Sequence, residues 1–208
     1  MTALDWRASV VAYIRAEAQP VDKFGHQPRL YELARQIAQA AEVTDGKTID
    51  DDVLFATSWM HDLGVFLGHR PSDPSELARW NHVPYTITRS RELLLEWGFP
   101  EEKLDAVAES IRTHQAKDEA VLAEAVVLRD ADILEQLGAV GALRALVKVG
   151  RDTRFQTYSD VLPVLEHSVK VLPGKLRLAH SRELAQGRVE VLAGLLKAIR
   201  EEAGDLLY

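Results

Sequence analysis

Two polar residues, His61 and Asp62, stand at the end of an apolar stretch that Gly64 follows. Residues 53–63 are apolar nearly all round a helix, which is typical of a helix buried in a core. An unpaired carboxylate is costly to bury, and a bound metal ion removes that cost. Neighbouring residues point about 100° apart on a helix, so both can reach one ion only near a helix end. The pair therefore predicts a metal site where a buried helix ends.

The chain has no cysteine, so a thiolate metal site, an iron–sulfur cluster, a disulfide and a cysteine nucleophile are all excluded. Imidazole and carboxylate ligands suit Zn, Mn, Fe, Co or Ni. A metal of this kind lowers the pKa of a bound water and clamps a phosphate oxygen, which are the two needs of phosphoester hydrolysis.

Helical periodicity recurs along the chain and predicts an all-α fold in a single domain, residues 1–208. The expected helices cover residues 4–18, 26–42, 50–63, 85–97, 101–114, 118–138, 139–148, 162–172 and 182–202, with a short helix near 73–76. Residues 64–84 are rich in Gly and Pro and are expected to form a loop, as are 44–47 and 149–159. No strand, repeat or low-complexity segment is expected.

The 208 residues carry a net charge of −7, which argues against a nucleic-acid polymer or an anionic membrane as partner. The first residues contain charges and no apolar run, so no signal peptide is predicted. No stretch approaches the roughly 20 apolar residues of a membrane span. We therefore expect a cytoplasmic protein.

Two further motifs lie on either side of the His61–Asp62 pair: His26 in the stretch GHQPRL, and Asp132 in DADIL. With them the chain resembles the metal-dependent phosphohydrolases of the HD superfamily, most closely the stand-alone bacterial HD hydrolases. The resemblance covers residues 22–150 and includes the DADxL(D/E)xxGAxG pattern, here 130–141. Many relatives carry Arg where this chain has Ile133, which leaves the substrate analogy open.

The resemblance implies an HD-type helical bundle, with its core at 22–150 and C-terminal helices at 159–204 packed on it. It also implies that His26, His61, Asp62 and Asp132 bind one divalent metal ion, which could be Mn, Fe, Zn, Co, Ni or Mg. Asp130, two residues before Asp132, is expected to face away and to hold a supporting group.

His82 and His114 lie between the pair and Asp132, in the order that binuclear HD members use. The resemblance leaves three roles open for them. They could bind a second metal ion, line the pocket and act with Asp62 in catalysis by binding phosphate or transferring protons, or be structural.

Three cations, Arg29, Arg79 and Lys117, lie within a few residues of a site histidine and are candidates to bind substrate phosphate. His69, His167 and His180 are expected at the surface or in loops, with His69 alone close enough to the pair to reach substrate.

The sequence thus predicts a metal-dependent phosphohydrolase in which metal-activated water attacks a small phosphorylated, nucleotide-like compound. Other HD chemistries stay open: a binuclear-iron oxygenase, a nitrile or cyanamide hydratase, and a non-catalytic metal-binding protein. A homodimer also stays open.

Overall fold

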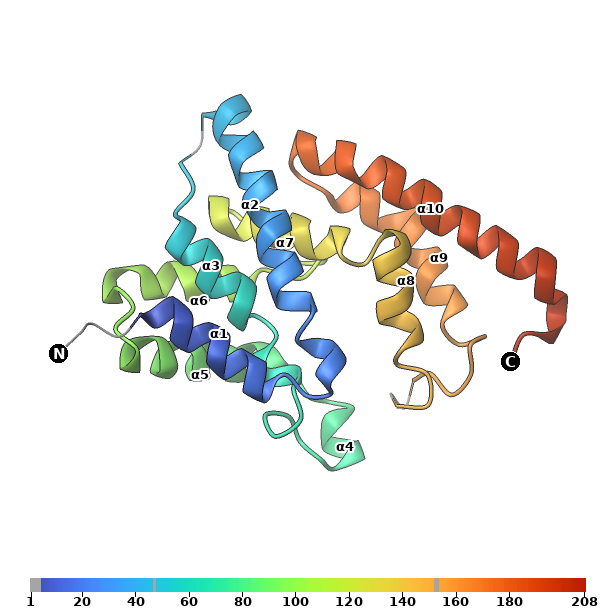
Figure 1. Ribbon diagram of the computed structural model, residues 1–208, viewed down its shortest axis with the longest axis horizontal. Helices are drawn as coiled ribbons and strands as arrows, with labels where there is room; N and C mark the ends of the chain where they lie inside the picture. The colour runs from blue at the N-terminus through green and yellow to red at the C-terminus, as the bar shows by residue number, and fades with distance from the viewer. Residues whose placement is uncertain (1–4, 47, 152–153) are drawn as a thin grey trace. The chain divides into compact units, whose positions relative to one another are not determined.

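Helices make up the regular structure in the computed structural model, which describes residues 5–46, 48–151 and 154–208 (Figure 1). The α-helices are α1 Trp6–Glu17, α2 His26–Asp45, α3 Asp51–Met60, α4 Pro74–Leu77, α5 His82–Glu96, α6 Leu104–Arg112, α7 Ala123–Leu134, α8 Gly138–Leu146, α9 Leu162–Val171 and α10 Ala179–Ala203. No strand occurs within the described ranges, so the prediction of an all-α fold is confirmed. No helix in these ranges is long and apolar enough to cross a membrane.

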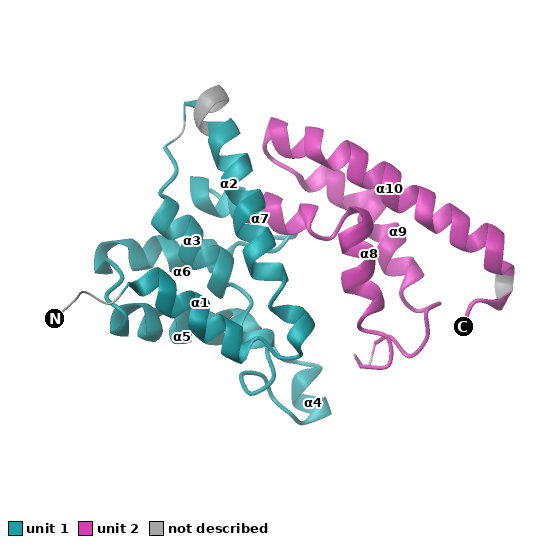
Figure 2. Cartoon of the chain, in the orientation of Figure 1, with its two compact units in different colours: residues 1–129 teal, residues 130–208 magenta. Residues whose placement is uncertain are grey.

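The chain divides into two compact units, residues 1–129 and 130–208 (Figure 2). Unit 1 contains α1 to α6 and the start of α7, and unit 2 contains the rest of α7 with α8, α9 and α10. That the two units form one domain stays a prediction.

Helix α3 is the centre of unit 1, because it packs against α1, α2 and α6. Every residue from Val53 to Met60 is buried, as the apolar pattern predicts. The helix begins at a cap, where the Asp50 carboxylate accepts hydrogen bonds from the amides of Asp52 (2.9 Å) and Val53 (3.3 Å). A buried cluster of apolar side chains from α1, α3, α5 and α6 surrounds it.

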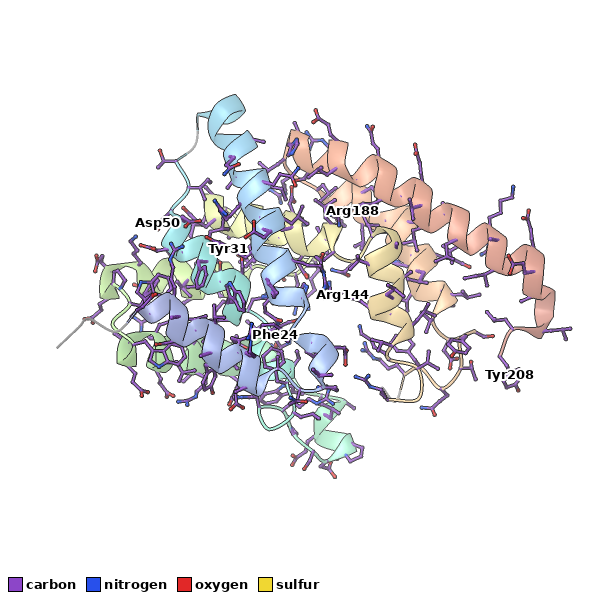
Figure 3. The ribbon with its side chains drawn as sticks, viewed as in Figure 1. Phe24, Tyr31, Asp50, Arg144, Arg188 and Tyr208 are labelled. Carbon is purple, nitrogen blue, oxygen red and sulfur yellow. The ribbon has the colours of Figure 1, made fainter. Side chains whose placement is uncertain are left out.

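Two cations from neighbouring elements hold the acidic start of α3, which consists of the cap Asp50, labelled in Figure 3, and the first-turn residues Asp51 and Asp52. The Lys103 Nζ atom lies 2.7 Å from an Asp52 carboxylate oxygen and 2.9 Å from one of Asp50. The Arg7 guanidinium lies 2.6 Å from the other Asp52 oxygen. The hydrogen bond from Lys103 holds the pKa of Asp52 below its usual range, against the opposing effect of burial.

In unit 2, α10 packs against α8 and α9. The Asp130 carboxylate is fully buried and accepts hydrogen bonds from the backbone amides of Arg177 (3.0 Å) and Leu178 (2.9 Å), immediately before α10 begins. Arg188 on α10, labelled in Figure 3, donates to the Leu134 carbonyl at the end of α7 (2.8 Å). These bonds join the start of unit 2's sequence to its last long helix and to the residues just before that helix.

Several helix boundaries differ from those predicted. Helix α5 begins at His82 instead of residue 85, because a proline at position 84 is tolerated in a first turn, whose amides have no partner within the helix. The helix predicted at 118–138 is shorter: α7 covers Ala123–Leu134, and α8 already begins at Gly138, whose φ of 72° favours glycine. Leu4, the predicted start of the first helix, lies outside the described residues, as do Lys47 and residues 152–153 of two predicted loops.

Candidate metal centre

The His61–Asp62 pair lies where α3 ends. His61 is the C-terminal cap of α3, and Asp62 has already left the helix with φ −102° and ψ 11°. A short 3-10 turn, η2 (Leu63–Val65), follows, and its Gly64 packs against the first turn of α5. The Gly64 amide donates to Thr86 Oγ1 (3.0 Å), and its carbonyl accepts from the Trp80 indole (2.8 Å). The glycine thus joins the pair to the helix that begins at His82.

Four predicted site histidines come together around the Asp62 carboxylate. The Nε2 atoms of His26 and His61 lie 3.4 Å apart, and His61 Nε2 lies 3.7 Å from Asp62 Oδ2. On the other carboxylate oxygen, His82 Nε2 lies 3.7 Å from Asp62 Oδ1. The His114 ring lies 5.1 Å from that of His61 and 5.6 Å from that of His82, measured between centroids.

Backbone carbonyls orient two of these imidazoles. His61 Nδ1 lies 3.2 Å from the Ser58 carbonyl, and His114 Nδ1 lies 2.7 Å from that of Ile111. Because a carbonyl oxygen only accepts, each Nδ1 carries the proton and each Nε2 keeps a lone pair. Each carbonyl belongs to the residue three positions earlier, so the end of each helix sets the direction of its own histidine.

The Asp62 side chain is 20 % exposed and ionised. Burial acts to raise its pKa, but the electrostatic interactions with His61, His26 and Lys23 outweigh burial and hold the pKa of this carboxyl well below its usual range. The centre of the cluster is therefore an anionic oxygen pair among nitrogen donors.

The donor set fits a metal ion. Two atoms each about 2.1 Å from an ion at a tetrahedral angle lie about 3.4 Å apart, and the His26 and His61 nitrogens have that spacing. Two groups of three ligand atoms fall within 4.8 Å of one another: His26, His61 and Asp62 form the first, and Asp62, His82 and His114 form the second. Asp62 belongs to both, with a different oxygen facing each side.

Asp132, the predicted fourth ligand, lies on α7 in unit 2. The side-chain amide of Gln136 donates to its carboxylate and to its backbone carbonyl, both at 3.2 Å. Its role as a ligand stays a prediction. The Asp130 carboxylate, by contrast, accepts hydrogen bonds from the two backbone amides that precede α10, and its supporting role at the site stays a prediction.

The three cations predicted to bind phosphate are all exposed. The Nη1 atom of Arg29 lies 2.9 Å from the position that a Cβ on Gly25 would take. The Arg29 side chain therefore folds back toward Gly25, the residue before His26. Among the described residues, no hydrogen bond or ion pair engages the side chains of Arg79 and Lys117. Their roles stay predictions.

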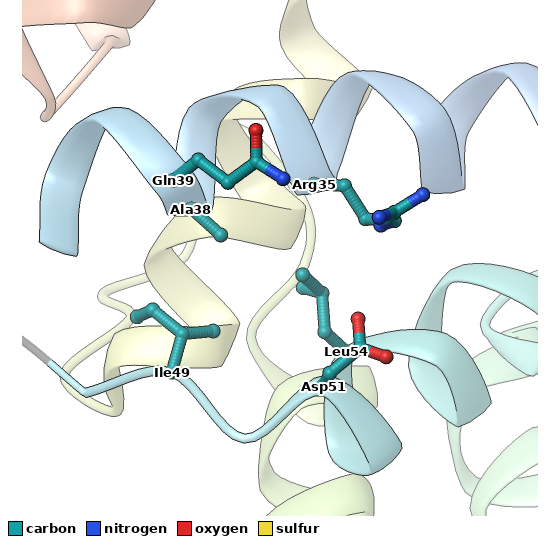
Figure 4. Close-up of a pocket in the computed structure, with 6 residues that line it drawn as sticks. All are labelled: Arg35, Ala38, Gln39, Ile49, Asp51 and Leu54. Atoms are coloured by element: carbon teal, nitrogen blue, oxygen red, sulfur yellow. The ribbon is translucent and has the colours of Figure 1, made fainter.

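The hollow in Figure 4 lies elsewhere in unit 1, with a volume of about 200 Å³. It is lined by Arg35, Ala38, Gln39, Ile49, Asp51 and Leu54. None of these is a predicted site residue, and two of the three polar groups already have partners: Asp51 binds Tyr31 and Arg7, and Arg35 lies 3.7 Å from Glu32. The side chains that could hold a metal ion lie in the histidine cluster instead.

A family profile described as HD domain matches residues 24–137, more than half of the chain. The chain belongs to the HD domain family. The match begins just before His26 and ends just after Asp132, so it contains every predicted ligand. No curated protein matches the sequence.

Solved structures share this HD fold across nearly the whole chain. YpgQ of Bacillus subtilis is 21 % identical, with a TM-score of 0.74 over 99 % of this chain and 100 % of its own. The same protein in complex with ADP is 20 % identical, with a TM-score of 0.71 over 96 % of this chain and 99 % of its own. An HD-superfamily hydrolase from Bacillus thuringiensis is 16 % identical, with a TM-score of 0.66 over 97 % and 98 % of the two chains.

Sequence reasoning missed one cation of the HD site, Lys23, whose positive charge helps to lower the pKa of Asp62. It ends the short 3-10 turn η1 (Val21–Lys23), three residues before His26, and that spacing was the available signal.

His69, expected at the surface or in a loop, lies in a loop but is largely covered, with 8 % of its side chain exposed. Its Nδ1 lies 2.8 Å from the Tyr85 hydroxyl and its Nε2 3.0 Å from the Glu17 carboxylate. Both ring nitrogens are engaged, so His69 joins α1 to α5.

Proposed function

We propose that this HD protein is a metal-dependent phosphohydrolase that acts on a small phosphorylated, nucleotide-like compound. The observation that carries the proposal is the cluster of four histidines on the two oxygens of Asp62. A divalent ion held there would lower the pKa of a water and withdraw charge from a phosphoryl oxygen. The chain's own residues would bind the ion, hold the phosphate and transfer protons.

Four residues would hold that ion. His26 and His61 present nitrogens at tetrahedral spacing, and Asp62 supplies an ionised oxygen. Asp132 is proposed as the fourth ligand on its DADIL motif alone. With His61 Nδ1 bound to the Ser58 carbonyl, the ring cannot turn away, and the site is built before an ion arrives.

His82 and His114 would serve the phosphate. An imidazole whose Nδ1 is bound to a carbonyl, as in His114, presents Nε2 to the site. In the protonated form that Nε2 would donate its proton to the leaving-group oxygen as the bond from phosphorus to that oxygen breaks, and a proton given up by the attacking water would replace it. His82 lies on the opposite side of Asp62 from His61 and supplies a second such group.

The surrounding cations favour a substrate with more than one phosphate. Lys23 and Arg29 lie on the His26 side, and Arg79 and Lys117 flank His82 and His114 in sequence. YpgQ, whose fold this chain shares, has been solved with ADP, which supports a nucleotide as the compound to test first.

The test compares Asp62→Ala with Asp105→Ala, a control carboxylate that is 89 % exposed and paired with Arg91. Freshly purified proteins are assayed for bound metal by elemental analysis and for phosphate release from a panel of nucleotides and phosphoesters. Asp62→Ala is expected to lose both the metal and turnover, whereas Asp105→Ala keeps both. Full turnover by Asp62→Ala would contradict the assignment of Asp62 to a catalytic metal site.

The second ligand group favours one rival, a binuclear-iron oxygenase, because Asp62, His82 and His114 could hold another ion. A metal content near two irons per chain, with oxygen consumed by the iron-loaded protein, would support that chemistry. A content near one ion, with phosphate released and no oxygen uptake, supports the hydrolase.

A further inference from the structure

Arg129 is a buried cation in unit 1, directly before the two aspartates of α7. Only 2 % of the residue is exposed, and its Nη2 atom donates to the Ala116 carbonyl at 2.7 Å. Arginine is seldom buried this fully unless its donors are engaged. Here at least one donor is engaged by the backbone of a short turn.

That turn starts at His114. Helix α6 ends at Arg112, and residues 115–118 then close on themselves: the Asp118 amide donates to the Gln115 carbonyl (2.9 Å), and the Gln115 amide to the Asp118 carboxylate (3.1 Å). Ala116 lies in the middle of the turn, and its only side chain is a methyl group. The turn therefore has little apolar surface of its own with which to pack.

We infer that Arg129 is a positioning residue for the phosphate-binding side of the site. Its guanidinium binds the Ala116 carbonyl and so holds the 115–118 turn against α7. The held turn then fixes the direction of the backbone after His114 and the position of Lys117. The inference rests on the proposed function for its effect on turnover, but the bracing of the turn does not depend on it.

The expected loss of activity on removing the Arg129 side chain follows from the constraints on His114. His114 is held at one end by the Ile111 carbonyl and at the other by the chain that enters the turn. Without the brace, that second constraint weakens while the first remains. Loss of a group that orients a ligand or catalytic side chain costs about 10- to 100-fold in activity or metal affinity.

The experiment compares Arg129→Ala and Arg129→Lys with Arg112→Ala, a matched control at the end of α6. Arg112 has a 60 % exposed side chain, and its ion pair is with Glu109 on the same helix. For ATP and ADP with the metal that the protein retains, kcat is expected to fall about 10- to 100-fold in Arg129→Ala. Added guanidinium should restore part of it, and Arg129→Lys should be intermediate. Arg112→Ala should stay within about twofold. An Arg129→Ala variant as active as Arg112→Ala overturns the inference.

Amide hydrogen exchange tests the brace without any substrate. In Arg129→Lys, which keeps the charge and is the safer variant for folding, the amides of Gln115 and Asp118 should exchange at least about tenfold faster than in the wild type, with α6 unchanged. Unchanged exchange in the turn overturns the inference. Faster exchange in the turn, in a protein whose wild type hydrolyses no phosphorylated compound, supports the brace and overturns the phosphohydrolase proposal instead.

Discussion

Gly64 is the glycine in unit 1 at which we expect an added methyl group to lower stability and turnover most. A Cβ there would lie 2.9 Å from the His82 carbonyl oxygen, 2.9 Å from Thr86 Oγ1 and 3.0 Å from His82 Cβ. Carbon atoms in a packed core sit about 3.5–4.0 Å apart, so in Gly64→Ala the first turn of α5 must retreat by roughly 0.5–1 Å. Two of the three contacts involve His82, which the retreat carries away from Asp62.

Two costs follow from that displacement. Overpacking of this kind destabilises a protein by about 1–3 kcal/mol, and stretching the buried Gly64–Thr86 hydrogen bond adds about 1 kcal/mol. The gap between His82 Nε2 and Asp62 Oδ1, now 3.7 Å, would widen. We therefore expect turnover to fall about 10- to 100-fold, as it does when a supporting contact is lost. The His26–His61 pair, on the other side of Asp62, should keep its spacing and its ion.

Urea unfolding, elemental analysis and nucleotide hydrolysis measure these effects. The matched control is Gly187→Ala in α10, where an added Cβ meets nothing within 4 Å. In an exposed helix interior the same methyl group should stabilise by about 0.5–1 kcal/mol, so the two variants should shift in opposite directions. A Gly64→Ala protein that unfolds at the wild-type urea concentration and turns over at the wild-type rate would refute the packing argument.

Three further outcomes are expected. Asp130→Asn should lower the free energy of unfolding by about 1–3 kcal/mol, measured in urea, while metal content is unchanged, because the carboxylate binds the Arg177 and Leu178 amides. The pKa of Asp52 is lower in the folded protein than the ordinary value of 3.8. The Asp52 carboxylate therefore contributes to stability above pH 3.8, and this contribution is lost as the pH falls through the lower pKa of the folded state. Lys103→Met should make that loss of stability smaller, measured by urea unfolding from pH 5 downward. Dialysis against a chelator should lower the melting temperature and abolish phosphate release, and added metal should restore both; a melting temperature unaffected by chelator would contradict a bound ion.

Much of the site could be predicted because its chemistry depends on residue types that are rare in a buried helix. His61 and Asp62 stood out on an apolar face, and the order of His26, His82 and His114 along the chain matched a known pattern; all five lie together in the structure. The all-α fold followed from periodicity, which is a local property of the sequence.

What sequence could not supply depends on contacts between distant residues. The Asp130 carboxylate binds amides 47 and 48 positions later, and nothing local distinguishes it from Asp132. Both nitrogens of His69 are engaged by side chains from other helices, which made a loop histidine part of the scaffold. The prediction that α5 begins at residue 85 is wrong, because Pro84 is typical of a loop but is also accepted in the first turn of a helix, and α5 begins at His82.

The boundary between the two units falls inside a helix. Units of a chain are ordinarily joined by exposed flexible linkers that tolerate added residues, but α7 runs through residues 129 and 130 without a break. A cut at this boundary would leave two short pieces of α7, residues 123–129 and 130–134. The helix has only 12 residues, and pieces shorter than that are marginal in water. We therefore expect neither unit to fold as a separate fragment.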